Sequence, residues 1–183
     1  MTTGTAVSVE EYLRTSYKPN CEFVDGVLVP KAMGTRKHSK VQTRIHDLIE
    51  KAFPHYEAMT ELTLRINDRK YLIPDLAVDL ASRPQDPYPL SPVHLCIEIL
   101  SPGDRVAEAF AKCEAYLAWG VPYAWILDPQ TCKAWEYSKE SGAPIEIHPA
   151  DGELAAGEIR ILLSEIFAVL SKAAPQVLPN RPG

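Results

Sequence analysis

The chain has 183 residues, of which 46% are hydrophobic and 23% charged, and its formal net charge is −5. This length and mixture are typical of a single soluble globular domain with its own core. The acidic balance argues against a protein that coats duplex nucleic acid, although a local basic patch can still bind it. The apolar runs fall far short of the roughly 20 residues of a membrane span, and the N-terminus lacks a signal-peptide pattern. We therefore expect a cytoplasmic protein with no membrane partner.

The first eighty residues carry signals for a short helix, a hairpin and a longer helix. Ser8 followed by Glu11 is a capping box, which opens a helix. Asp25-Gly26 between two short apolar runs predicts a tight hairpin. Apolar residues then recur at the spacing of an amphipathic helix, and alternating apolar residues follow as strands. The expected elements are a helix to Arg14, a hairpin over 21–29, a helix within 35–52, and strands over 62–66 and 71–80.

The second half begins with a loop, because prolines crowd residues 83–92. A strand over 94–100 is followed by a helix to Trp119, which Gly120 and Pro122 end in the expected order. The remaining expected elements are a hairpin of strands at 123–127 and 132–137, weak strands near Ile145 and Ile159, and a helix over 164–172.

This order of elements predicts an α/β (α+β) fold, in which helices flank a curved mixed β-sheet and an N-terminal helix and hairpin precede it. The connection from the strand of Glu98 to Tyr123 is long enough for a parallel crossover. We expect one domain over residues 1–174 and a Pro-rich C-terminal tail over 175–183.

Two carboxylates, Asp75 and Glu98, stand in segments that otherwise read as apolar strands. An ionised carboxylate in a buried strand is costly unless it is paired or binds a metal. If the strands pair, alternation of side chains puts both acids on one side at neighbouring positions. Two such oxygens suit magnesium, which also keeps waters and binds substrate phosphate, and the backbone carbonyl of Ile99 can add a ligand. A structural ion pair is the alternative.

Lys112 is the candidate cation for these acids. It lies beside the apolar stripe of the helix after Glu98, so its stem can run along apolar surface and deliver the ammonium near the carboxylates. The alternative is an exposed pair with Glu108, four residues earlier, which is worth only about 0.2–0.5 kcal/mol.

A set of motifs in fixed order extends over nearly the whole chain, namely Glu22–Gly26, Pro74-Asp75, Glu98–Pro102, Lys112, Tyr116, Gly120–Pro122 and Trp125–Pro129. This set resembles the Uma-type endonucleases, a family of the PD-(D/E)xK restriction-endonuclease-like superfamily. The usual lysine of the superfamily stands two residues after the glutamate, where this chain has Leu100. The resemblance implies that Lys112, on the following helix, replaces it.

The resemblance implies a restriction-endonuclease-like core and a metal-dependent endonuclease that hydrolyses phosphodiester bonds of nucleic acid, with DNA as the substrate and a homodimer as the assembly. Asp75, Glu98 and the Ile99 carbonyl would hold magnesium, for which manganese can substitute. Lys112 would orient the attacking water or neutralise the phosphate. Glu22 would be a further acid at the metal or behind it, unless it lies in solvent beside the hairpin.

Two other functions stay open from the sequence. A nucleic-acid or protein-binding module that kept the fold without turnover would be consistent with Leu100 and with the acidic net charge. A metal-dependent hydrolase acting on another phosphoester is the third interpretation, because a fold does not by itself determine the substrate.

The helix expected within 35–52 also carries a basic row, Arg36, Lys40 and Arg44. Such a row can follow a nucleic-acid backbone, but Asp47 and other acids further along favour a solvated face. His38 can bond at the site, and we favour a surface capping position for it.

Overall fold

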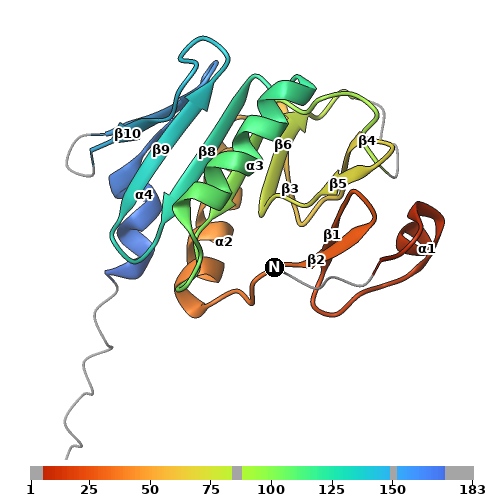
Figure 1. Ribbon diagram of the computed structural model, residues 1–183. Helices are drawn as coiled ribbons and strands as arrows, with labels where there is room; N and C mark the ends of the chain where they lie inside the picture. The colour runs from red at the N-terminus through yellow and green to blue at the C-terminus, as the bar shows by residue number, and fades with distance from the viewer. Residues whose placement is uncertain (1–5, 84–87, 149–151, 172–183) are drawn as a thin grey trace, which may run out of the picture.

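The structure is a computed structural model that describes residues 6–83, 88–148 and 152–171. A mixed sheet forms its centre (Figure 1). Only its β7–β8 pair is parallel among the described strands. In spatial order the strands are β10 (Ile145–Ile147), β9 (Lys133–Ser138), β8 (Tyr123–Asp128), β7 (Leu95–Ile99), β6 (Leu76–Leu80) and β3 (Tyr56–Thr60). The mixed α+β fold with a mixed sheet is therefore confirmed.

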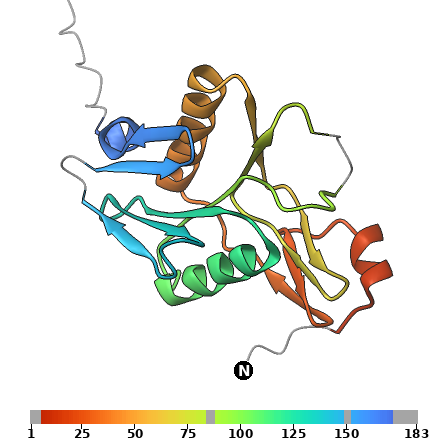
Figure 2. The same ribbon diagram turned by 90° about the horizontal axis from the view of Figure 1, so that it is seen from above.

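Helices cover both faces of this sheet (Figure 2). On one face lies α2 (Arg36–Ala52), whose first turn is capped by the Thr35 hydroxyl, together with α4 (Leu163–Phe167). On the other face lies α3 (Val106–Trp119), which ends at Gly120 with a positive φ of 128°. The α3 helix connects β7 to β8, so the predicted parallel crossover is confirmed.

A smaller antiparallel sheet lies beside the central one and carries the N-terminal hairpin. Its strands are β2 (Val27–Pro30), β1 (Cys21–Val24), β5 (Lys70–Leu72) and β4 (Leu64–Asn67). Asp25 and Gly26 both have positive φ, as a tight hairpin requires. The preceding helix α1 (Val9–Arg14) begins at Ser8, whose hydroxyl accepts from the Glu11 amide at 3.1 Å. These two N-terminal elements are as predicted.

The single strand expected over 71–80 is wrong. The chain leaves the small sheet after Leu72 and enters the central sheet at Leu76. Pro74 has no N–H to donate to a ladder, so a break here is physically favoured. The break matters because it places Asp75 at the junction of the two sheets.

Other differences are smaller. Two strands were not predicted, namely β3 and β11 (Glu153–Ala156), and β11 pairs with the expected strand β12 (Ile159–Leu162). The last helix ends at Phe167, followed by a 3-10 turn (Ala168–Leu170), and is shorter than expected. Part of the proline-rich loop and the proposed tail over 175–183 lie outside the described residues.

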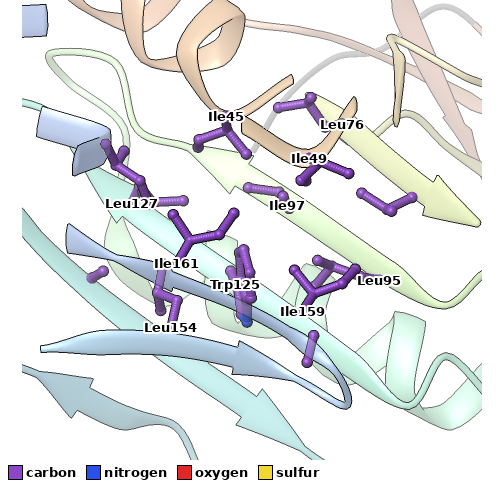
Figure 3. Packing of buried hydrophobic residues seen from close by; sticks show 14 of the residues in the cluster. Ile45, Ile49, Leu76, Leu95, Ile97, Trp125, Leu127, Leu154, Ile159 and Ile161 are labelled. Carbon is purple, nitrogen blue, oxygen red and sulfur yellow. The ribbon is translucent and has the colours of Figure 1, made fainter. Parts of the chain in front are cut away.

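The main core lies between α2 and the central sheet (Figure 3). Ile45 and Ile49 of α2 pack over Ile97 and Trp125, and each of these side chains is fully buried. The β11–β12 hairpin closes the same core with Leu154, Ile159 and Ile161. In the described residues no helix has the length and apolar character needed to cross a bilayer.

Candidate active site

Asp75 and Glu98 lie opposite each other on neighbouring strands. The antiparallel register pairs Leu76 with Ile97 and Ala77 with Cys96, so the next position outward sets Asp75 against Glu98. The two residues are only 4% and 7% exposed. Paired positions share a face of the sheet, so the expectation that both acids point to one side agrees with the register.

Both acids line one cavity of about 640 Å³. Its walls come from the end of the N-terminal hairpin, the first turn of α2, the end of β7 and the start of α3. The polar lining side chains are Glu22, Lys31, His38, Asp75, Glu98, Ser101, Asp104, Arg105, Glu108 and Lys112.

Lys112 reaches the acids. Its Nζ lies 2.8 Å from Glu98 Oε1 and 2.8 Å from Glu22 Oε1, and its stem is largely buried. Glu108 instead pairs with Arg105, at 3.9 Å. Lys112, at the edge of the buried face of α3, therefore places its ammonium in the cavity. The alternative prediction, an exposed pair between Lys112 and Glu108, is wrong.

Glu22 is buried, at 6% exposure, and does not lie in solvent beside the hairpin. Besides Lys112, its Oε1 accepts a 2.9 Å hydrogen bond from the Ile73 amide. It comes from β1 of the small sheet, whereas Glu98 comes from the central sheet, so Lys112 links the two sheets through their carboxylates.

Burial and charge act in opposite directions at the Glu98–Lys112 pair. Burial raises the pKa of Glu98 from 4.5 to about 7, although the Lys112 ammonium opposes that rise. Burial also opposes the charge on Lys112, but the carboxylates of Glu98 and Glu22 outweigh it and raise the pKa of this lysine. Tyr116 of α3 donates its O–H to Glu98 Oε1 at 2.7 Å. Lys112 is therefore held as an ammonium, with Glu98 fixed between two donors.

Asp75 is fixed from several sides. Its Oδ2 accepts from the Ile99 amide at 2.6 Å, and its Oδ1 accepts from Lys31 Nζ at 2.9 Å. The Gln42 side chain donates to the Asp75 carbonyl at 2.8 Å. The Ile99 amide thus orients the Asp75 carboxylate. Metal binding by the Ile99 carbonyl stays a prediction.

Lys31 is a site residue that was not predicted from the sequence. Its Nζ also donates to the Ile73 carbonyl at 2.9 Å and lies 3.0 Å from a Glu61 oxygen. Burial disfavours its charge, but the Asp75 and Glu98 carboxylates raise its pKa. Lys31 follows an edge strand, a place typical of a solvated lysine, and no periodicity relates it to Asp75. We find no sequence signal that would have identified it.

The expectation that His38 caps the surface is wrong. The side chain is buried, with Nε2 3.6 Å from Asp75 Oδ1 and Nδ1 3.4 Å from Ser101 Oγ. Its position follows from the start of α2 at Arg36, which aims the first turn of the helix at the cavity.

Two of the three residues in the basic row of α2 bond to backbone carbonyls, whereas Arg36 is exposed. Lys40 Nζ donates to the Val169 carbonyl at 3.1 Å, and Arg44 Nε donates to the Glu165 carbonyl at 3.1 Å. Cations at the C-terminal end of a helix satisfy carbonyls that lack partners. These two residues therefore attach the last helical segment to α2.

The donor set fits a hard divalent cation. Two oxygen-rich carboxylates face one cavity, and magnesium accepts one or two carboxylates while it keeps waters and binds phosphate. Among the described residues, no three His, Cys, Asp or Glu side chains form a ready-made metal cage. Two carboxylates of this kind could hold such a cation only together with water and substrate oxygens.

Comparisons with known proteins agree with this fold. The model of the Uma2 family, described as "Putative restriction endonuclease", matches residues 9–163. A solved structure titled as "a putative nuclease belonging to DUF820", from Anabaena variabilis ATCC 29413, has a TM-score of 0.80 and 22% identity. The match covers 90% of this chain and 99% of that one, and it shows a shared fold. No match was found among curated proteins. Because the family model covers most of this chain, the chain belongs to the Uma2 family.

Proposed function

We propose that this protein is a magnesium-dependent endonuclease that hydrolyses phosphodiester bonds of DNA. One observation supports the proposal above all: Lys112 lies 2.8 Å from Glu98 although Leu100 occupies the usual lysine position. The two acids and the cation of the expected site, Asp75, Glu98 and Lys112, thus line one cavity.

In this proposal Asp75 and Glu98 hold the metal, with the Ile99 carbonyl as a further ligand and manganese as a substitute ion. The metal, when bound, lowers the pKa of a coordinated water and stabilises the charge that develops on the phosphate. The Ile99 amide and the Tyr116 hydroxyl orient the two carboxylates.

Lys112 has an electrostatic role in the proposed reaction. In the metal-free protein the neighbouring carboxylates raise its pKa, which favours the charged ammonium form. As a compact positive charge it can neutralise a phosphate oxygen and orient the attacking water. Glu22 positions Lys112 through its 2.8 Å contact.

The partners and location belong to the same proposal. We place the enzyme in the cytoplasm, with duplex DNA as its substrate. We propose that it acts as a homodimer, because two copies of a single-site enzyme can cleave the two strands of a duplex.

Plasmid cleavage with magnesium or manganese tests the function. Asp75→Asn, Glu98→Gln and Lys112→Met should each reduce nicking by about a hundredfold or more, because each removes a charge from the reacting centre. Glu10→Gln, at a side chain that is 85% exposed on α1, is the control and should cleave normally. Full activity in Asp75→Asn would contradict the proposal.

A non-catalytic nucleic-acid-binding module is the second candidate, favoured by the pairing of both proposed metal ligands with lysines. Binding that falls steeply with salt, together with no cleavage under either metal, would support it.

A further inference from the structure

Lys31 makes a more complete set of contacts than a surface lysine does. Each of its three N–H donors has an acceptor, and the acceptors come from separate parts of the chain: Asp75 Oδ1, the Ile73 carbonyl and Glu61. The side chain is only 13% exposed. A buried ammonium requires such pairing to offset its lost hydration, so the fold is built around this charge.

Glu61 supports the same conclusion from the backbone. Its φ is +55°, in the left-handed region that a glutamate rarely adopts. In this conformation its carboxylate pairs with Lys31 at 3.0 Å, and its amide donates to the Asp75 carbonyl at 3.3 Å. Asn20 Nδ2 contacts the same carboxylate at 3.4 Å. The strained residue thus holds the Lys31–Asp75 pair in place.

The contacts of Asp75 place Lys31 in competition with a metal. Oδ2 accepts from the Ile99 amide, which is part of the central sheet, whereas Oδ1 accepts from Lys31. A cation arriving at Oδ1 would meet an ammonium 2.9 Å from that oxygen. Two like charges at one oxygen repel strongly in a buried site, so Lys31 opposes the binding of a metal ion there.

A neighbouring cavity offers space for the ammonium of Lys31 after its displacement from Asp75. This cavity, of about 250 Å³, shares Lys31, His38 and Asp75 with the larger one and is also lined by Glu61. A lysine stem is flexible, so Lys31 can withdraw from Asp75 into this space while it keeps Glu61 as its partner.

We propose that Lys31 is a resident competitor for the metal at Oδ1 of Asp75. It neutralises and fixes this carboxylate in the metal-free protein, and a divalent ion must displace it in order to bind. Lys31 is thus a positioning residue that sets the metal affinity of the site. The inference rests on the metal dependence of the proposed function.

Isothermal titration with MnCl₂ and MgCl₂, without nucleic acid, measures the affinity directly. Lys31→Met removes the charge and keeps a stem of similar length, and we expect about tenfold tighter binding than in the parent protein. Lys37→Met is the matched control, since it removes the same charge from an exposed residue of α2, and its affinity should equal that of the parent. A merely structural role for Lys31 would instead weaken binding.

Equal or weaker metal binding by folded Lys31→Met would overturn the proposal, and so would the absence of metal binding from both parent and variant. The nuclease proposal fails separately: tighter binding in Lys31→Met without plasmid cleavage in the parent would refute the enzyme and keep the competitor. Plasmid cleavage by the parent, together with unchanged metal affinity in Lys31→Met, would refute the competitor and keep the enzyme.

Trace acetylation of the unmodified protein provides a test that needs no variant to fold. Peptide mass spectrometry should show that Lys31 becomes several-fold more reactive when MgCl₂ is added, while Lys37 stays unchanged. Displacement separates Lys31 from the Asp75 carboxylate, so the ammonium loses its proton more readily to give the neutral amine that is acetylated. Equal protection of Lys31 with and without bound metal would contradict displacement.

Discussion

At the scale of single residues, the chemistry of the cavity depends on an unequal number of buried charges. Among the buried ion-paired side chains described here, the carboxylates of Glu22, Asp75 and Glu98 face the ammonium groups of Lys31 and Lys112. Burial raises the pKa of Glu98 to about 7, and the nearby carboxylates of Asp75 and Glu22 also act to raise it.

The raised pKa of Glu98 makes the stability of the metal-free protein depend on pH. Between 4.5 and about 7 the folded protein retains a proton that the unfolded chain releases, so the free energy of unfolding falls as pH rises through this window. Glu98→Gln cannot ionise and should escape this loss. From about pH 5 to about pH 8, its stability relative to the parent should therefore rise by about 1–3 kcal/mol.

Urea unfolding in EDTA at both pH values measures this difference, with Glu10→Gln as the control because its side chain is exposed. A stability difference between Glu98→Gln and the parent that does not change with pH would show that Glu98 is already ionised at pH 5.

At the scale of elements, the ends of strands and helices bring the site together. β6 begins just after Asp75, β7 ends just after Glu98, and the first turn of α2 brings in His38. The basic row of α2 lies further along the same helix, where Lys40 and Arg44 bond to carbonyls of the last helical segment. One helix thus contributes to the cavity at its start and to the packing of the C-terminal segment beyond it.

We expect Lys40→Met and Arg44→Met each to lower the free energy of unfolding by about 1 kcal/mol, because each removes a side-chain hydrogen bond to a helical carbonyl. DNA affinity and its dependence on salt should stay unchanged. Urea unfolding and fluorescence anisotropy over a salt series check the two parts. A salt slope reduced by about one in Lys40→Met would show instead that this lysine contacts phosphate.

At the scale of the whole molecule, the site depends on how the small sheet sits against the central one. Glu22 belongs to the small sheet and Glu98 to the central sheet. A buried cluster packs the two sheets together, with Leu64 and Leu72 from the small sheet against Ala77 and Cys96 from the central one. Packing of this cluster therefore determines whether Glu22 and Glu98 can share Lys112.

Leu72→Ala should both destabilise the protein and impair catalysis. Removal of this buried side chain should cost about 2–5 kcal/mol and allow Glu22 to move relative to Glu98. Leu154→Ala is the matched control, because Leu154 is equally large and buried but packs in the main core away from the cavity. Cleavage rates per folded molecule, with unfolding measured in parallel, should fall in Leu72→Ala only. Equal rates in the two variants would contradict the role of the sheet junction.

Much of the secondary structure could be predicted because its signals are local. Ser8 with Glu11, Asp25-Gly26 and the stop at Gly120 each act within one turn, and the structure confirms all of them. The junction at Pro74 was harder to predict, because apolar residues stand on both sides of it, at 71–73 and 76–78. Two strands of different sheets therefore read as one.

For the candidate site, the sequence determined the spacing of the acids along their strands, and alternation then predicted that Asp75 and Glu98 share a face. Tertiary structure decided which cations they meet. Lys31 lies 44 positions from Asp75 in the chain and bonds to it across two sheets, while His38 becomes buried because α2 points at the cavity. No regular spacing of residues in the sequence marks such long-range contacts. They arise only when packing excludes water and requires each buried charge to find a partner.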